Sequence, residues 1–149
     1  MKTEVSKSSN KNEIKLGAFF VIDIDYFKQV NDNYGHERGD TVIRSVAKVL
    51  QNTFGDENEI VARIGGDEFA AFCPDINDNL FIENKCQKIR NLMQEVRYAE
   101  DKPPVTLSIG IVNFRYGEDD SQFSDLFNRA DNALYDVKAR GRNGYEICE

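Results

Sequence analysis

The sequence predicts an α/β (α+β) domain with a mainly antiparallel, five-stranded central sheet flanked by helices, in the order β-α-α-β-β-α-β-α-β. Short apolar runs typical of buried strands alternate with stretches in which apolar residues recur at helical spacing. Two such runs, 60–64 and 69–73, are separated only by the glycine-bearing residues 65–68, which predicts a β-hairpin. Because a hairpin joins antiparallel strands, a purely parallel doubly wound sheet is excluded.

The boundaries of the elements follow from the same patterns and from the turn residues between them. Strands are expected at 17–25, 60–64, 69–73, 105–114 and 144–148, and helices at 26–33, about 39–53, 80–98 and 123–139. Pro74 is expected to stop the strand before it, and Pro103 and Pro104 to prevent the helix before them from continuing. Residues 1–13 are polar and are expected to form a flexible N-terminal tail, followed by one domain over 14–149.

Composition excludes several classes of protein. The 149 residues fit one domain, and 40% hydrophobic with 30% charged residues is a globular profile rather than a disordered one. A net charge of -7 argues against nucleic-acid binding, which needs a basic face. The longest apolar run, 18–22, is too short for a membrane segment, and the three cysteines lack the spacing of a disulfide framework or zinc site. A reduced, cytoplasmic protein is the simplest interpretation.

Acidic residues stand at two places that an antiparallel sheet can bring together. Asp23 and Asp25 end the first strand and are expected on one face of it, and Asp67 and Glu68 lie at the hairpin tip. Each pair alone has an ordinary explanation, as solvated acids at a strand end or as a plain type I′ turn. Together they favour a metal-dependent enzyme acting on a nucleoside triphosphate, because Mg²⁺ prefers oxygen ligands and bridges carboxylates to phosphates.

Further polar residues allow a structural and a functional interpretation. Asn31 and Asp40 fit helix caps, or the donor and acceptor pattern that reads a purine edge. His36, the only histidine, is more often a turn or surface residue than a catalyst. Lys138 and Arg142 fit the C-terminus of a helix, where cations complement the dipole, or a clamp on a triphosphate.

These stretches, in this order, resemble the GGDEF domain of diguanylate cyclases over residues 16–147. The matching segments are DIDYFKQVNDNYGHERGD at 23–40, RIGGDEF at 63–69, TLSIG at 106–110 and ADNALYDVKARGRN at 130–143. The resemblance implies a palm-like nucleotidyl-cyclase fold. It also implies condensation of two GTP molecules into cyclic di-GMP and pyrophosphate, by metal-assisted attack of a 3′-hydroxyl on an α-phosphate across a head-to-head homodimer.

The resemblance also implies roles for residues. Mg²⁺ (or Mn²⁺) would be held by Asp23, the Ile24 carbonyl and Asp67, with Asp67 or Glu68 as the catalytic base. The substrate-binding set comprises Asn31 and Asp40 for guanine, His36 near the ribose, and the backbone around Tyr26 and Phe27 with Lys138 and Arg142 for the β- and γ-phosphates.

Two departures from the family pattern qualify this expectation. Asp56 and Glu59 stand where the family's usual product-inhibition site has Arg-x-x-Asp, so feedback through that site is not expected. The family's N-terminal helix with its Leu-Thr-Gly-Leu motif has no counterpart before Leu16, and any regulatory domain is expected to lie outside this sequence. The alternatives are a minimal palm-domain cyclase that makes another cyclic nucleotide, and a non-catalytic GTP-binding regulatory module.

Overall fold

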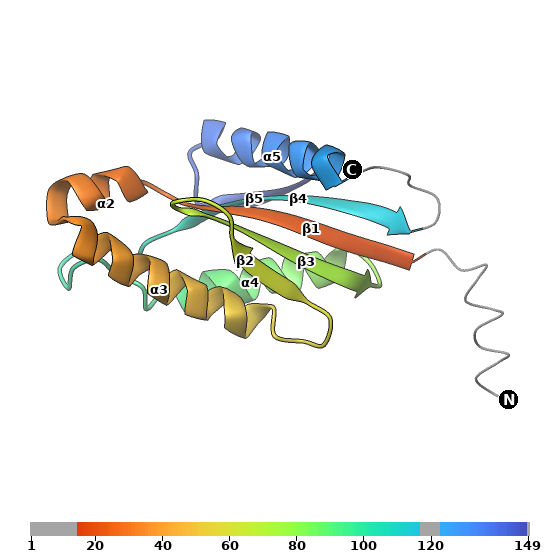
Figure 1. The fold of residues 1–149 in the computed structure, drawn as a ribbon, viewed down its shortest axis with the longest axis horizontal. Coiled ribbons are helices and arrows are strands. Elements are labelled where there is room, and N and C mark those ends of the chain that lie inside the picture. The colour runs from red at the N-terminus through yellow and green to blue at the C-terminus, as the bar shows by residue number, and fades with distance from the viewer. Residues whose placement is uncertain (1–14, 117–122, 149) are drawn as a thin grey trace, which may run out of the picture.

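The computed structural model describes residues 15–116 and 123–148, and these confirm the predicted order of elements (Figure 1). The predicted N-terminal tail, 1–13, lies outside the described residues. The strands are β1 (Lys15–Ile24), β2 (Ile60–Arg63), β3 (Glu68–Ile76), β4 (Leu107–Tyr116) and β5 (Gly144–Cys148). The helices are α2 (Phe27–Tyr34), α3 (His36–Thr53), α4 (Asn79–Met93) and α5 (Phe123–Ala139).

The five strands form one sheet in the order β2-β3-β1-β4-β5, with β1 in the centre. All neighbours are antiparallel except β4 and β5, which are parallel, so the sheet is mixed and mostly antiparallel as predicted. Helices α3 and α4 cover one face and α5 covers the other (Figure 1).

Alternation along β1 decides which residues meet which helix. Phe20 and Ile22 are fully buried in the cluster with α3 and α4, whereas Phe19 and Val21 are buried in the cluster with α5. Asp23 continues the second series and therefore lies on the α5 face. The alternation of side chains along β1 therefore places this carboxylate on the side of the sheet that α5 covers.

Helix α5 packs with its backbone directly against β4. A Cβ atom added at Gly110 would lie 2.9 Å from the Cα atom of Leu134, and closer still to the Ala130 carbonyl oxygen and the Leu134 amide nitrogen. Only glycine therefore lets the helix approach this deeply. The depth of α5 in turn sets the position of its last turn, which carries Lys138.

Strand β3 runs through Pro74 to Ile76, so the expectation that Pro74 ends the strand was wrong. Proline is tolerated at strand edges and bulges, because no ladder hydrogen bond is required of its nitrogen there. Strand β2 pairs with β3 only over residues 69–72, and the β1–β3 register shifts between Leu16 and Ala18, opposite Pro74.

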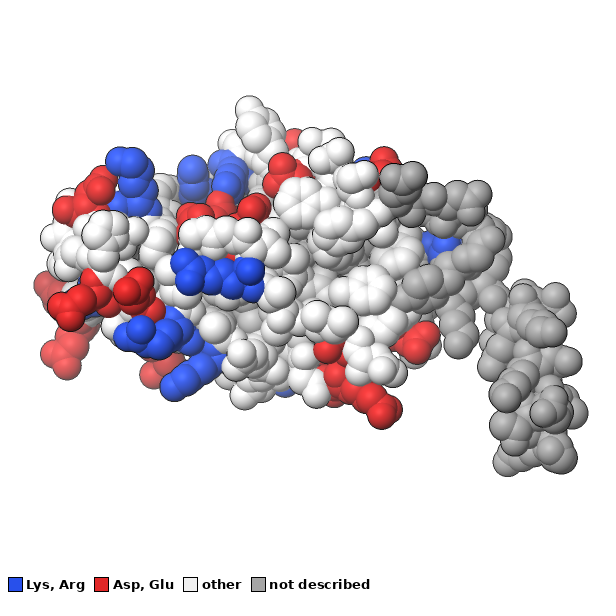
Figure 2. All heavy atoms as spheres, viewed as in Figure 1, with Lys and Arg blue, Asp and Glu red and all other residues white. Residues whose placement is uncertain are grey.

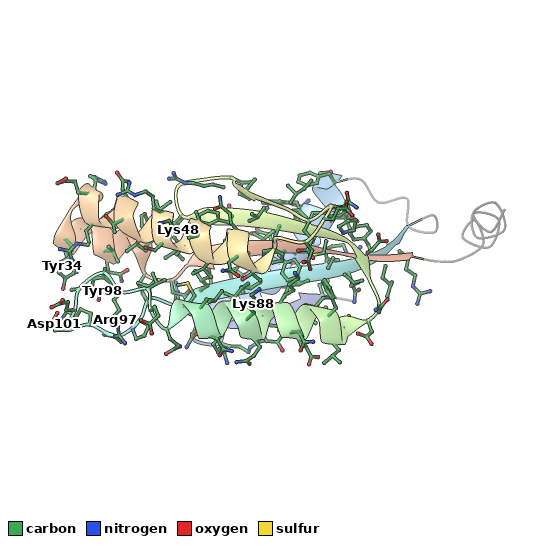
Figure 3. The ribbon with its side chains drawn as sticks, turned by 90° about the horizontal axis from the view of Figure 1, so that it is seen from below. Tyr34, Lys48, Lys88, Arg97, Tyr98 and Asp101 are labelled. Atoms are coloured by element: carbon green, nitrogen blue, oxygen red, sulfur yellow. The ribbon has the colours of Figure 1, made fainter. Side chains whose placement is uncertain are left out.

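Helix α4 ends at Met93 rather than at 98, well before the two prolines. The Val96 amide donates to the Met93 carbonyl (3.0 Å) and the Val105 amide to the Val96 carbonyl (2.7 Å), which turns the chain back on itself. The following segment contacts α2, where the Tyr98 and Tyr34 rings lie 5.0 Å apart between centroids (Figure 3).

Helix α3 begins at His36, three residues earlier than expected, directly after the α2 helix. Gly35 makes the sharp junction with a φ of 88°, a value that glycine adopts at little cost.

Part of the α5 face is left open beside β2 and β3. An apolar groove of about 380 Å³ lies there, and Ile60 and Phe123 at its border are 61% and 66% exposed. Figure 2 shows broad uncharged surface between the charged groups in this view. Among the described helices, none combines the length and apolar character needed to cross a bilayer.

Candidate active site

Asp23 lies at the end of the central strand, between the hairpin and α5. Its Cα atom is paired in register with Glu68 of β3 and with Ser108 of β4. The side chain is only 14% exposed, and it forms an ion pair with Lys138 from the last turn of α5. The predicted metal ligand and a predicted phosphate ligand therefore contact each other directly.

The hairpin tip is attached to the same strand end. The Ile24 amide donates to the Asp67 carbonyl oxygen (3.1 Å), so Asp67 and Glu68 are held beside Asp23. Arg63 stabilises the tip from below: its Nε donates to the carbonyls of Gly65 (3.0 Å) and Gly66 (3.1 Å), and its Nη2 to Gly66 (2.8 Å).

The tip is not a type I′ turn. Among the described glycines, positive φ values occur at Gly35 and Gly141 but not at Gly65 or Gly66, and a type I′ turn requires them. Strand β2 ends at Arg63 and β3 begins at Glu68, so four residues connect the strands instead of two. The longer loop is possible because the Arg63 guanidinium binds its carbonyl groups.

The acidic groups in this cluster oppose each other's ionisation. Burial raises the pKa of Asp23; Lys138 opposes this shift, and the negative charge of Asp67 adds to it. Burial also raises the pKa of Glu68, and the charges of Asp23 and Asp131 raise it further. Carboxylates in this state gain from a nearby cation, because a cation relieves both the repulsion and the lost hydration.

The donor set fits a divalent ion that is shared with a substrate. Within residues 15–116 and 123–148, no group of three or more His, Cys, Asp or Glu side chains is placed to hold a metal alone. Mg²⁺, however, is commonly bound through one or two carboxylates together with substrate phosphates. Asp23 and Asp67 supply two carboxylates, and Asp23 already binds a cation, the Lys138 ammonium.

Asp25 is held by protein donors, whereas Asp23 pairs with Lys138. Asp25 follows the last residue of β1, and one of its donors is Ser108, the residue paired with Asp23 in the neighbouring strand. Asp25 is 5% exposed and accepts hydrogen bonds from Thr106 Oγ1 (2.7 Å), Ser108 Oγ (2.6 Å) and the Asn143 amide (3.0 Å).

The residues predicted to bind guanine lie at the α2–α3 junction. Asn31 faces Gly39, and a Cβ atom added at Gly39 would overlap the Asn31 Oδ1 atom. That oxygen is buried and stands out, among the described side chains, as an acceptor without a hydrogen-bond partner. His36 and Asp40 are exposed on the first turns of α3. An unpaired buried acceptor needs a donor, which a base edge can supply.

Three of the four residues predicted to bind phosphate, Tyr26, Phe27 and Arg142, lie at the N-terminus of α2, whereas Lys138 contacts Asp23. Tyr26 precedes the helix with a φ of 58°, and the Arg142 guanidinium lies 4.9 Å from the centre of its ring. The Phe27 side chain is buried in the core, so this residue can contribute only its backbone amide. Helix N-termini present such amides, and their dipole favours anions.

Sequence reasoning gave no role to Arg63 or Gly110, although both lie within the matching segments. The signal for Arg63 was its place at the last ladder position before two glycines. The signal for Gly110 was a glycine inside an apolar strand, which often marks close approach of another backbone. The hydroxyls of Thr106 and Ser108, two residues apart on one side of a strand, were the signal for the partners of Asp25.

Carboxylates, cations and helix N-terminal amides gathered at one end of a mixed α/β sheet define a nucleotide-cyclase-like domain. Residues 1–144 match the profile of the family described as "Diguanylate cyclase, GGDEF domain". The chain therefore belongs to the GGDEF family of diguanylate cyclase domains, which confirms the resemblance seen in the sequence.

Several known proteins are similar to this chain. "Probable diguanylate cyclase DgcF" of Escherichia coli (strain K12) is 38% identical over 144 residues, which cover 94% of this chain and 45% of that protein. "Diguanylate cyclase A" of Treponema denticola is 33% identical over 141 residues, which cover 93% of this chain and 36% of that protein. The chain thus spans less than half of either relative.

The fold likewise matches a solved structure. The active GGEEF domain of a diguanylate cyclase from Vibrio cholerae aligns with a TM-score of 0.80 and 28% identity, covering 99% of this chain and 90% of that one. The mostly antiparallel five-stranded sheet with four helices is therefore the fold of this family.

Proposed function

We propose that this chain is the catalytic domain of a diguanylate cyclase, which condenses two GTP molecules into cyclic di-GMP and pyrophosphate. The observation that carries the proposal is the cluster at the end of β1, where Asp23 meets Lys138 from α5 and the hairpin acids Asp67 and Glu68. The chemistry needs charge neutralisation and positioning at the α-phosphate rather than a covalent intermediate, and this cluster can supply both.

Asp23 and Asp67, with the Ile24 carbonyl, would hold Mg²⁺ or Mn²⁺. When bound, the ion supplies positive charge to the phosphates and favours the ionised 3′-hydroxyl. The raised pKa values of Asp23 and Glu68 fit this role. Burial opposes the ionisation of these carboxylates, so a nearby cation stabilises their charged form more than it would at an exposed site. Either Asp67 or Glu68 would accept the proton of the attacking hydroxyl.

Guanine would be selected at the α2–α3 junction. The Asp40 side chain and the unpaired Asn31 oxygen offer acceptors, and the N1–H and N2–H groups of guanine are donors. An adenine base lacks a donor at N1, so one acceptor would remain unpaired. His36 would lie near the ribose.

The triphosphate would lie between α2 and the end of α5. The backbone amides of Tyr26 and Phe27 at the N-terminus of α2 would donate to it, and Lys138 and Arg142 would add two cations. Each domain would hold one GTP, so catalysis requires two domains facing each other, and a homodimer follows. We place this reaction in the cytoplasm, with regulation by further domains of a longer protein.

Feedback by the product through the usual site is not expected. Glu59 is paired with Lys85 (2.9 Å), and both side chains are largely buried, whereas the exposed Asp56 lies 3.6 Å from the same ammonium. An acid therefore faces solvent where the family pattern has an arginine. An anionic dinucleotide would be repelled there. Tight binding of cyclic di-GMP to a variant with its active site blocked would contradict this part of the proposal.

Products identified by mass after incubation with GTP, ATP and Mg²⁺ separate the proposal from its alternatives. Cyclic di-GMP alone supports a diguanylate cyclase. An adenine-containing product supports a minimal palm-domain cyclase, and saturable GTP binding without any product supports a regulatory module.

Asp67→Ala is expected to abolish turnover, because it removes a metal ligand and a candidate base together. Asp75→Ala is the matched control, since Asp75 is an exposed acid on the same strand and away from the tip. Product formed by Asp67→Ala at the rate of the control would refute the metal assignment.

A further inference from the structure

We infer that Asp25 is a positioning residue that holds the Tyr26 turn and the Arg142 turn together as one phosphate-binding unit. The inference rests on the proposed function for the identity of the ligand, a nucleoside triphosphate. Its structural part concerns a buried carboxylate that joins three segments far apart in the sequence.

The contacts of Asp25 use the whole carboxylate. Oδ1 accepts from Ser108 Oγ (2.6 Å), and Oδ2 accepts from Thr106 Oγ1 (2.7 Å) and from the Asn143 amide (3.0 Å). The Asp25 amide itself donates to the Thr106 carbonyl (3.0 Å). Hydrogen bonds to a charged acceptor are stronger than neutral ones, and burial strengthens them further. Because three donors already bind its two oxygens, Asp25 positions these segments and does not act as a metal ligand.

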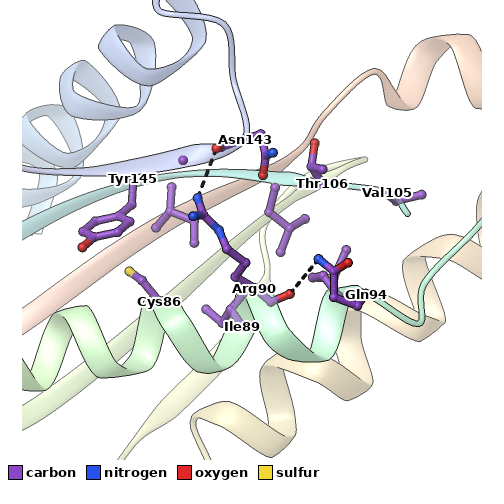
Figure 4. A pocket seen from close by; sticks show the side chains of 12 residues that line it. Cys86, Ile89, Arg90, Gln94, Val105, Thr106, Asn143 and Tyr145 are labelled. Atoms are coloured by element: carbon purple, nitrogen blue, oxygen red, sulfur yellow. Dashed lines mark hydrogen bonds between the residues drawn. The ribbon is translucent and has the colours of Figure 1, made fainter. Parts of the chain in front are cut away.

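The segment that Asp25 holds has an unusual backbone. Arg142 and Asn143 adopt φ values of 68° and 52°, and two successive non-glycine residues in the left-handed region persist only when their surroundings hold them. The Asn143 amide is held by Asp25, and its carbonyl accepts from Nη2 of Arg90 on α4 (3.3 Å; Figure 4). The Arg142 amide donates to the Val137 carbonyl (3.0 Å), which ties the turn to α5.

The same residue controls the other half of the unit. Tyr26, the next residue in the chain, also has a left-handed conformation with a φ of 58°. The Arg142 guanidinium stacks over the Tyr26 ring at 4.9 Å. Asp25 thus fixes both partners of this contact, one through the chain and one through Asn143. Loss of its carboxylate would release the Arg142 turn and leave Asp23, the hairpin and the α2–α3 junction in place.

The experiment compares binding of two nucleotides by the wild type and by Asp25 variants. The probes are an α,β-methylene analogue of GTP, which cannot be cleaved at the reacting bond, and GMP, which lacks the β- and γ-phosphates. Asp25→Ala is expected to weaken the analogue about tenfold or more, the scale of one lost charged hydrogen bond, and to change GMP affinity by about twofold or less. Hydrogen exchange at the Asn143 amide is expected to accelerate in the same variant.

Two further variants separate positioning from general stability. Ser108→Ala removes one hydrogen bond of Asp25 but keeps the bond to Asn143, so it should lower the melting temperature and leave analogue affinity unchanged. Asp25→Asn retains an oxygen that can accept from Asn143 and should keep most of the affinity. If Asp25→Ala does not fold, Asp25→Ser replaces it, because a serine hydroxyl is too short to reach Asn143.

The outcomes are distinguishable. Unchanged analogue affinity, or equal losses for the analogue and GMP, would overturn the inference. A wild type that binds neither nucleotide would instead refute the proposed function, and the Asn143 exchange rate would then decide alone whether Asp25 holds the turn.

Discussion

Replacing Gly110 with alanine tests whether the depth of α5 determines the site. The added Cβ atom would lie 2.9 Å from Leu134 Cα and still closer to the Ala130 carbonyl oxygen, whereas ordinary contact begins at 3.4 Å. All of these neighbours are helix backbone, so no side-chain rotation relieves the clash. Helix α5 must retreat by at least 0.5 Å, and by more at the Ala130 carbonyl.

The cost of this displacement can be bounded. Overpacking a close-packed core costs about 1–3 kcal/mol, and contacts to rigid backbone belong at the upper end. At about 2–4 °C per kcal/mol for a chain of this length, a loss of about 3 kcal/mol lowers the melting temperature by about 6–12 °C. Lys138 moves with the helix, so its ion pair with Asp23 is weakened and cyclase turnover should fall as well.

Thermal unfolding and product formation are measured together, with Gly144→Ala as the matched control. Gly144 lies in the neighbouring strand β5, and a Cβ atom there would make only an ordinary contact of 3.8 Å with Val137. A Gly110→Ala protein as stable and as active as this control would refute the reasoning, because it would show that α5 can shift without disturbing the site.

Three further predictions concern the rest of the site. Gly39→Ala should displace Asn31 and raise KM for GTP about tenfold with little change in melting temperature, as measured by steady-state kinetics. Arg63→Ala should free the hairpin tip, accelerate hydrogen exchange there and lower kcat. A variant that removes an exposed salt bridge away from the tip should leave both the exchange rate and kcat unchanged. The pKa values of Asp23 and Glu68 are raised in the folded protein, so ionising these groups destabilises the metal-free fold. The free energy of unfolding therefore falls as the pH rises through the pKa values of the folded state. The melting temperature of Asp23→Asn relative to wild type should therefore increase as the pH rises above the ordinary carboxyl range of about pH 4, and Mg²⁺ should remove the difference.

The parts of the fold that sequence predicted are those governed by local periodicity. Apolar alternation in β1 and helical spacing in α3 and α5 are direct consequences of which face is buried, and these elements were confirmed. The errors arose where tertiary contacts outweighed a local rule. Pro74 is accommodated because β2 is too short to pair with it, and α4 ends early because Val96 bonds to Val105.

The candidate site was predictable as a set of residues but not as a set of contacts. Spacing placed Asp23 and the hairpin acids within reach of one another, since strands in register bring their ends together. It could not separate Asp23 from Asp25, because both are acids two residues apart and only their partners, Lys138 for Asp23 and two hydroxyls for Asp25, divide their roles. Nor could it show that Asn31 packs on Gly39, a contact between two helices.

Several unfavourable features of the described residues gather at the same end of the sheet. Asp23 and Asp67 repel each other, Asn31 keeps an unpaired buried oxygen, and Arg142 and Asn143 hold left-handed backbone. A cation relieves the first feature, a base edge the second, and phosphates can use the third, so one ligand, a metal-bound nucleoside triphosphate, compensates all of them at once. Because binding to the folded state alone stabilises it, Mg²⁺ with the uncleavable GTP analogue should raise the melting temperature more than either does separately.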